Sequence, residues 1–372
     1  MTDHDVVIVG AGPAGLLLGC LLLQRGIDVV VCERRTDADG RSRAIGIHRP
    51  GLDALDVIGI GASVRSEALA LSGGEVRSRR RTLASLDFTA QRPVLVLPQQ
   101  RTGALLDGRL RELRGDALLP GRTVRAVRDE GDVARVAFDG GEEVQEMTCR
   151  VAVVADGVHG PLRERLGIGL RVHAGRGRYA MLDVEGSAAS DRAVLHCEPG
   201  GLVESLPLPG GWRRWVVRED EHPLRTAAEF RAAIETRTGA SVDVPDGAVP
   251  TRFRAAQRTA SRLQSGCVAL LGDAAHELSP IGGQGMNLGW SNAVRLAHDI
   301  VGGLASGDVD LRRYGRTALS AARRAQRRSA FYMSMGAPSS GAPLAARELL
   351  VRMLGSAPLR SWTTGLLTMR GL

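Results

Sequence analysis

The apolar residues of this 372-residue chain are grouped in short runs that glycine-rich turns separate. Asp5 to Val9 form a β-branched apolar run, and glycine turns lead from it into a second apolar stretch, Leu16 to Gln24. Gly26 interrupts the pattern before a third run, Val29 to Val31. This order predicts a strand, a turn, a helix and a second strand. A strand without polar alternation is typical of a parallel sheet that helices cover on both faces.

Two later apolar runs have the same character, and each ends near an aspartate. Val151 to Val154 leads into Ala155-Asp156-Gly157, and Val268 to Leu271 leads into Gly272-Asp273. After Asn287 the apolar positions recur with helical spacing, and an arginine- and alanine-rich helix is predicted through Tyr314 to Ser329. We interpret the arginines of that helix as a solvated face rather than a membrane or partner surface.

The region between these runs has a different texture. Pro-Gly and Gly-Gly turns separate short strand-like stretches, which predicts an antiparallel sheet; the stretches are Ala193 to Cys197, Gly201 to Leu208 and Trp212 to Val217. We therefore predict an α/β fold, α+β overall, in which a mixed or antiparallel substrate domain is inserted into a Rossmann-like domain with C-terminal helices. The Rossmann-like domain is expected over 1–70, 96–170 and 255–372, and the substrate domain over 71–95 and 171–254.

Composition narrows the classes of function. The formal net charge is +8, but all 49 basic residues are arginine and none is lysine. Together with the abundant alanine, glycine and valine, this indicates a GC-rich coding background rather than a nucleic-acid surface. The absence of lysine excludes P-loop NTPases and pyridoxal enzymes, because both need a lysine at the active site.

The cysteines and the apolar runs argue against zinc, disulfide and membrane structures. The five cysteines are scattered and never form a Cys-x-x-Cys pair. The N-terminus carries Asp3 and Asp5 in place of a basic segment, and the longest apolar run, Leu16 to Leu23, is far shorter than the roughly 20 residues that span a bilayer. We expect a cytoplasmic protein, a monomer or a homodimer, without a membrane span or a nucleic-acid partner.

The first candidate ligand site is the glycine pattern after the first predicted strand. Gly10, Gly12 and Gly15 have Gly-x-Gly-x-x-Gly spacing, which lets bare backbone approach a pyrophosphate whose charge the helix N-terminus stabilises. Alone, this pattern also fits a turn that binds nothing. Glu33 favours an adenine dinucleotide, because it ends the second strand about 20 residues on, where a carboxylate receives the ribose hydroxyls.

A second candidate site follows the run from Val268 to Leu271. Gly272-Asp273 precedes Pro280 and a glycine-rich run, Gly282 to Asn287, from which a helix is predicted to start. An acceptor at the carboxyl end of a strand can hold a polyol hydroxyl, and exposed amides at a helix start can stabilise negative charge. Both features suit the ribityl chain and the reduced ring of a flavin.

These segments resemble the group A FAD-dependent monooxygenases, the para-hydroxybenzoate hydroxylase-like family, over nearly the whole chain. We expect the short two-domain form, without the thioredoxin-like C-terminal domain that some relatives carry. The similarity rests on the N-terminal loop with Glu33, on Arg43-Ala44-Ile45-Gly46, on Pro98-Gln99 before a helix, on Ala155 to Arg163 and on Gly272 to Asn287.

The resemblance implies FAD as the cofactor and NAD(P)H as a transient co-substrate. Arg43 would then be the catalytic-site residue nearest to the flavin and the substrate, and the loop with Pro280 would form one wall of the reaction centre. Asp273 would hold the ribityl chain, and Asp156-Gly157 would lie under the cofactor. The residues that the resemblance places around FAD are Gly10, Gly12, Pro13, Ala14, Gly15, Glu33, Arg34, Arg43, Gln99, Val124, Asp156, Gly157, Gly272, Asp273, Pro280, Gly283, Gly285, Met286 and Asn287.

The sequence departs from the family pattern at two positions. Gly160 stands where serine is usual, which weakens the argument for nicotinamide binding, and Gly103 stands where many relatives have glutamate. No second Gly-x-Gly-x-x-Gly with a following acid is present, and Gly59-Ile60-Gly61 is predicted to be a turn. A separate NAD(P)H domain is therefore not expected, which argues against reductases with two dinucleotide domains.

The activity that the resemblance implies is hydroxylation of an aromatic or polyketide-like small molecule in secondary metabolism, through a flavin hydroperoxide formed with dioxygen. The cofactor carries that chemistry, while protein groups position the substrate and exclude water. An epoxidase, a Baeyer–Villiger oxygenase or a double-bond reductase of the same fold stays open. A non-enzymatic FAD protein fits less well, because a structural FAD would not need the glycine-rich segment beside its ring.

Residues that contact the substrate are harder to identify. A lone histidine in a strand is more often packed or solvated than catalytic. Two tryptophans three positions apart on one strand would point to opposite faces, so at most one of them could line a pocket. The candidates are His48, Tyr179, His196, Trp212 and Trp215.

Overall fold

A computed structural model of the chain describes residues 2–37, 45–141, 143–173, 177–186, 190–279, 283–357 and 359–371. Its central sheet has eight strands in the order β19-β20-β11-β1-β2-β8, with β10 and β9 continuing from β11. β1 runs parallel to β2 and β11, and β11 runs parallel to β20, which confirms the predicted parallel sheet. The strands are β1 (His4–Val9), β2 (Val29–Glu33), β8 (Leu118–Pro120), β9 (Val124–Asp129), β10 (Ala134–Asp139), β11 (Val144–Val154), β19 (Gln264–Ser265) and β20 (Val268–Leu270).

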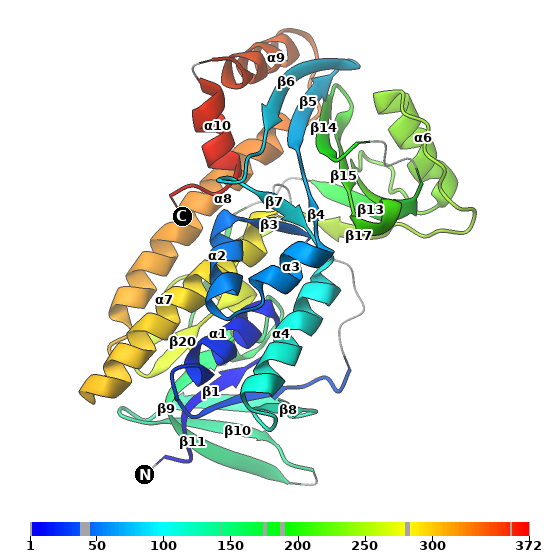
Figure 1. Ribbon diagram of the computed structural model, residues 1–372. Helices are drawn as coiled ribbons and strands as arrows, with labels where there is room; N and C mark the ends of the chain where they lie inside the picture. Colours follow the sequence, from blue (N-terminus) through cyan, green and yellow to red (C-terminus); the bar gives the residue numbers. More distant parts are fainter. Residues whose placement is uncertain are drawn as a thin grey trace.

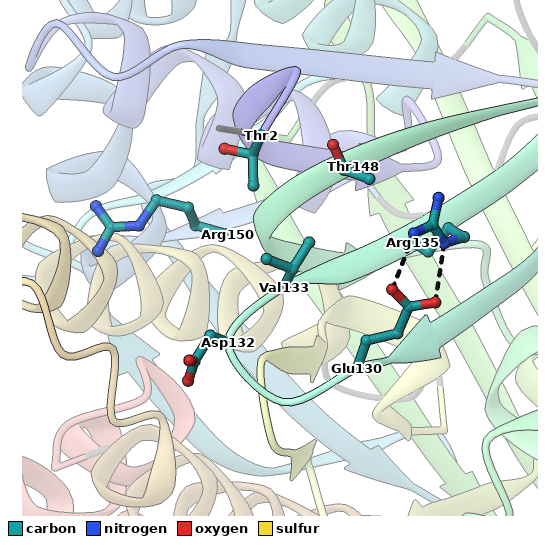
Figure 2. A pocket seen from close by; sticks show the side chains of 7 residues that line it. All are labelled: Thr2, Glu130, Asp132, Val133, Arg135, Thr148 and Arg150. Atoms are coloured by element: carbon teal, nitrogen blue, oxygen red, sulfur yellow. Dashed lines mark hydrogen bonds and ion pairs between the residues drawn. The ribbon is translucent and has the colours of Figure 1, made fainter.

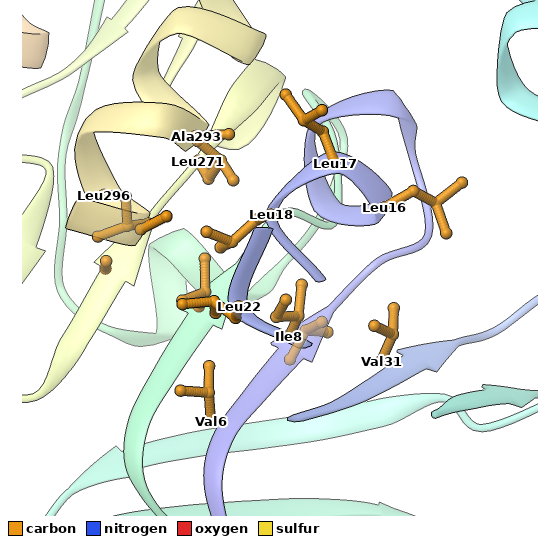
Figure 3. Packing of buried hydrophobic residues seen from close by; sticks show 14 of the residues in the cluster. Val6, Ile8, Leu16, Leu17, Leu18, Leu22, Val31, Leu271, Ala293 and Leu296 are labelled. Atoms are coloured by element: carbon orange, nitrogen blue, oxygen red, sulfur yellow. The ribbon is translucent and has the colours of Figure 1, made fainter. Parts of the chain in front are cut away.

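Helices bury the apolar strands of this sheet. α1 (Pro13–Leu23) packs against β1 and against α4 (Gln99–Leu113) and α7 (Gln284–Ser306). Figure 3 shows buried side chains of β1, α1, β2 and α7, among them Ile8, Leu18, Val31 and Leu296, which belong to one cluster. Val7 and Leu18 are fully buried, and this burial on all sides explains why neither β1 nor α1 has a polar stripe.

Two shorter helices lie over this layer. α2 (Arg49–Val57) packs against α7, and α3 (Gly61–Glu67) contacts α4 (Figure 1). Gly59, between α2 and α3, has a φ of +85°, so the predicted turn at this position is confirmed.

A second sheet of seven strands has the order β17-β13-β16-β15-β14-β5-β6. All neighbouring strands are antiparallel except β5, which pairs in parallel with β14. These strands come from the two segments predicted to form the substrate domain, while the domain boundaries stay a prediction. The strands are β5 (Gly73–Ser78), β6 (Arg81–Asp87), β13 (Arg178–Glu185), β14 (Arg192–Glu198), β15 (Gly201–Pro207), β16 (Trp212–Arg218) and β17 (Thr251–Arg254).

The two faces of the seven-stranded sheet pack against different helices. On one face Val203, Trp215 and Val217 form a core with Phe230 of α6 (Ala227–Thr238), and α6 lies on the outer side of the sheet in Figure 1. On the opposite face, here called the inner face, strand residues such as Leu202 and Val216 pack near the end of α8 (Arg312–Met335).

Small sheets and C-terminal helices complete the fold. β3 (Gly46–His48) and β4 (Leu69–Ala70) pair with β7 (Val94–Val96), and β18 (Gln257–Ala260) joins β12 (Leu170–His173) to β21 (His276–Glu277). α8 is longer than predicted at both ends, and it is followed by α9 (Gly341–Gly355) and α10 (Leu359–Leu367). None of the helices in the described ranges is both long and apolar enough to cross a membrane.

Candidate functional site

In the glycine loop between β1 and α1, two glycines are required by steric contacts within the fold and one is not. Gly10 has a φ of +110°, and a Cβ there would collide with the carbonyl oxygen of Ala155. A Cβ at Gly15 would collide with the carbonyl oxygen of Gly10. Gly12, by contrast, has a φ of −72°, and a Cβ there would meet no atom of the described residues within 4 Å. The fold therefore explains Gly10 and Gly15, whereas Gly12 borders open space at a helix N-terminus, as a bound pyrophosphate would require.

The Glu33 carboxylate lies beside this loop. Its Oε2 accepts a hydrogen bond of 2.8 Å from the backbone N of Ala11. The backbone carbonyl of Glu33 accepts a hydrogen bond of 2.8 Å from Arg122, which brings the start of β9 at Val124 alongside. Arg34 is exposed next to the carboxylate. The residues predicted to hold the adenosine half of the cofactor are thus neighbours in the structure.

The second glycine turn is in direct contact with the first loop. Gly272 has a φ of +63°, and a Cβ there would lie 3.2 Å from the Cβ of Ala14. The fully buried Trp290 of α7 donates a 3.0 Å hydrogen bond from Nε1 to the carbonyl of Pro13. Asp273, directly after Gly272, is exposed at this junction. Two segments that lie about 260 residues apart in the sequence therefore form one continuous site.

The start of α7 is fixed by the side chain of Asn287. Its Oδ1 accepts from the backbone N of His48 (2.9 Å), and its Nδ2 donates to the carbonyls of Gly46 (2.9 Å) and Gly283 (3.0 Å). Gly283 is in the left-handed conformation, and no side chain of the described ranges caps the helix. The first-turn amides, including those of Gly285-Met286, have no partner within the helix, so they can stabilise negative charge on a ligand.

Asp156 and Gly157 follow β11 and lie against the glycine loop. The first glycine, Gly10, touches the backbone of Ala155. Burial raises the pKa of the Asp156 carboxyl, and its Oδ1 is buried without a hydrogen-bond partner in the part of the chain that the structure describes. A Cβ at Gly160 would collide with this carboxylate, so glycine in place of the usual serine lets Asp156 keep its position. A buried oxygen without a partner fits a ligand that brings its own hydroxyl donors, as FAD does.

Arg43 and Pro280 lie outside the described residues, so their roles at the reaction centre stay predictions. The segments next to them are described. Leu97 donates a 2.9 Å hydrogen bond to the carbonyl of Ile45, which places Gln99 at the start of α4 close to the stretch that follows Arg43. Gln99 is half-buried there.

The predicted substrate residues do not share one surface. His48 is buried at the start of α2, and its imidazole lies against Gly283 rather than on the seven-stranded sheet. Tyr179 is buried on the inner face, where its ring stacks on Phe253 at 5.6 Å. Trp215 is part of the core under α6. His196 has the opposite strand parity to Leu195 of the inner face, and Trp212 is 40% exposed at the start of β16. Of these five, only Tyr179 is buried on the inner face of the sheet.

Two buried polar groups, Glu204 and Gln284, were not predicted as functional from the sequence. Glu204 is in the middle of β15, 6% exposed, and burial raises the pKa of its carboxyl to about 7. Gln284 is the first residue of α7 and 1% exposed, and its amide has no hydrogen-bond partner among the residues that the structure describes. The signal for Glu204 was its position as a lone acid within the apolar run Gly201 to Leu208.

A surface hollow of about 700 Å³ lies elsewhere, at the turn between β9 and β10 (Figure 2). It contains the ion pair between Arg135 and Glu130, in which Arg135 Nε lies 2.8 Å from Glu130 Oε1. None of the residues predicted to bind the cofactor lines it; the lining residues are Thr2, Glu130, Asp132, Val133, Arg135, Thr148 and Arg150.

Comparisons with known proteins identify relatives of this chain. A family described as FAD binding domain matches residues 3–329. A Streptomyces rimosus protein, 12-dehydrotetracycline 5-monooxygenase/anhydrotetracycline 6-monooxygenase, is 33% identical over 314 residues, which cover 79% of this chain and 61% of the relative. The chain thus spans less than two thirds of that relative's length.

Solved structures give the same fold. The anhydrotetracycline hydroxylase OxyS of Streptomyces rimosus superposes with a TM-score of 0.82 at 30% identity, covering 99% of this chain and 76% of that one. The p-nitrophenol 4-monooxygenase PnpA of Pseudomonas putida DLL-E4 superposes with a TM-score of 0.88 at 21% identity over 99% of this chain and 98% of that one, which supports the fold alone.

Proposed function

This chain belongs to the FAD binding domain family, the group A flavin monooxygenases, and we propose that it hydroxylates an aromatic small molecule with NAD(P)H and dioxygen. The observation that carries the proposal is the contact between the two glycine turns at Ala14 and Gly272. This contact joins a pyrophosphate loop to a helix start that can face a flavin ring. When bound, FAD would supply the redox chemistry and the activation of dioxygen.

The chain's own residues would bind and orient that cofactor. Gly12 would let the pyrophosphate approach the start of α1, and Glu33 would accept hydrogen bonds from the ribose. Asp273 would hold the ribityl hydroxyls at the end of β20. The amides at the start of α7, which Asn287 holds beside β3, would stabilise negative charge at the ring edge.

The names of the relatives support a proposal for the substrate class. The proteins at 33% and 30% identity are named for tetracycline precursors, so we propose a polycyclic phenol of the polyketide type for this chain. The inner face of the seven-stranded sheet would form one wall of the substrate chamber, since Leu206 of that sheet packs with Ile45, which follows Arg43 in the chain.

The proposal is tested by incubating the purified flavoprotein with NADPH, isotopically labelled dioxygen and anhydrotetracycline or simpler polycyclic phenols. We expect substrate-dependent NADPH oxidation and a product that has gained one labelled oxygen on an aromatic carbon. A ring-expanded ester or an epoxide would favour the Baeyer–Villiger or epoxidase alternative. NADPH consumption with a reduced, oxygen-free product would favour the double-bond reductase.

A further inference from the structure

Glu204 has an unusual position in the seven-stranded sheet. Along β15, Leu202 faces the inner side and Val203 faces α6, so strand alternation places Glu204 on the inner side with Leu202. Its direct neighbours on the adjoining strands are Leu195 and Val216, and both are apolar residues of the inner face. A carboxylate thus stands at the centre of this wall, and the residues directly beside it are apolar.

The carboxylate has no partner within the described part of the chain. Burial alone raises its pKa, with no compensating hydrogen bond or cation. Two neighbouring acids differ: the buried Glu219 accepts a 2.6 Å hydrogen bond from Arg252 Nε, and the half-buried Asp183 accepts a 2.7 Å bond from Arg214 Nε. A buried carboxyl without a partner destabilises a fold, and a group of this kind calls for a reason beyond packing.

Two sets of contacts connect the surroundings of Glu204 with the predicted cofactor site. Leu206, two positions along the same strand, packs with Ile45, which belongs to the stretch that follows Arg43. On the other side, Tyr332 of α8 packs against the inner face. Burial raises the pKa of Tyr332, and the Gln284 amide at the start of α7 lies close enough to offset part of that rise, although the two groups do not meet at hydrogen-bonding geometry. Two buried polar groups therefore border the same region between the sheet and the flavin segments.

We propose that Glu204 binds the substrate by accepting the proton of a hydroxyl group on its aromatic ring. This inference rests on the proposed function. In the step, the O–H bond of the substrate breaks and an O–H bond forms on Glu204, so a phenol becomes a phenolate and no electron is transferred. The phenolate is the more electron-rich ring, and the proton stays on a carboxyl that the apolar wall shields from water. The preferred substrate therefore carries a free phenolic hydroxyl.

The other titratable groups that face Glu204 do not change their charge near neutral pH. Burial raises the pKa values of Tyr179, Cys197 and Tyr332, so these groups are uncharged at neutral pH. The charged groups nearby, Arg214 and Asp183, form a bidentate ion pair with each other, and Arg218 lies over the Tyr179 ring at 6.0 Å. A pH dependence of substrate binding near neutrality is therefore assigned to Glu204.

The test compares the holoenzyme with its Glu204→Gln and Glu204→Leu variants. The probes are a monohydroxyanthraquinone and its methyl ether, and binding is followed by the perturbation of the flavin spectrum between pH 5.5 and 8.5. Wild-type protein is expected to bind the phenol at least about tenfold more tightly than the ether and to lose protons from the phenol as it binds, which a colour change reports. Both variants are expected to bind the two probes equally and to show no pH dependence.

The melting temperature of the variants distinguishes substrate binding by Glu204 from a purely structural role of this residue. Glu204→Leu removes a buried carboxyl without a partner, so its melting temperature is expected to rise by about 2–4 °C while discrimination between the probes is lost. Equal binding of phenol and ether by the wild type, full discrimination by Glu204→Gln, or a lower melting temperature of Glu204→Leu overturns the inference. A purified protein that cannot hold FAD contradicts the proposed function instead.

Discussion

Substitution by alanine should mainly reduce the stability of the fold at Gly10 and mainly reduce the affinity for FAD at Gly12. Gly10 has a φ of +110° and its Cα faces the carbonyl of Ala155, so Gly10→Ala adds both backbone strain and a collision with backbone. Strain of this kind costs about 1–3 kcal/mol, and the collision adds to it. Gly12 has a φ of −72° and open space around it, so Gly12→Ala should cost at most about 1 kcal/mol through poorer capping of α1.

The order reverses when FAD binding is measured. The new methyl group of Gly12→Ala would occupy the space where the pyrophosphate approaches the backbone, and we expect at least about a hundredfold loss of FAD affinity, near 2.7 kcal/mol. Urea unfolding of the flavin-free proteins gives the stability term, and titration with FAD, followed by its fluorescence, gives the binding term. Gly103→Ala, in an open position of α4, is the matched control. Wild-type FAD affinity in Gly12→Ala would refute the assignment of the loop.

Three further outcomes follow from the structure. Asn287→Ala removes two hydrogen bonds that tie α7 to β3 and a third to the Gly283 carbonyl, so we expect a loss of about 2–4 kcal/mol of stability by urea unfolding and weaker FAD binding. Asn292→Ala, whose amide pairs with His276 and not with β3, should keep FAD affinity. Trp290→Phe removes the bond to Pro13 and leaves a small cavity at a fully buried position, so we expect a loss of about 2–4 kcal/mol with little change in flavin content. Burial raises the pKa of Glu204 from 4.5 to about 7, so the folded state holds this proton more tightly and the stability of the protein falls as the pH rises from 4.5 to 7. Glu204→Gln should remove that fall, which is on the order of 3 kcal/mol. Identical profiles of stability against pH for the two proteins would contradict this assignment.

The sequence predicted the elements whose signals are local. The apolar run before Gly10 predicted a buried parallel strand, and Gly-x-Gly-x-x-Gly spacing with Glu33 predicted the loop that the structure brings together. The contact between Ala14 and Gly272 required the resemblance, because residues 260 positions apart carry no local signal of contact. The family likeness also gave no reason for Gly160, which the structure explains by the position of the Asp156 carboxylate.

Other features depend on tertiary packing. The sequence does not show which of Trp212 and Trp215 is buried in a core. Trp215 is in the core because strand alternation points it to the face that α6 covers. Glu204 is one of 41 acidic residues, and its burial follows from the pairing of β15 with β14 and β16. The hydrophobic pattern of the sequence locates the turns between these strands. It does not show which face of the sheet α6 covers, because that depends on the packing of the whole domain.

The most direct test of the central claim is the visible absorption spectrum of the purified protein, with its flavin released and quantified. The site geometry predicts one FAD per chain and the yellow spectrum of an oxidised flavin, which NADPH bleaches in the absence of dioxygen and air restores. A colourless protein that takes up no FAD on reconstitution would contradict the account.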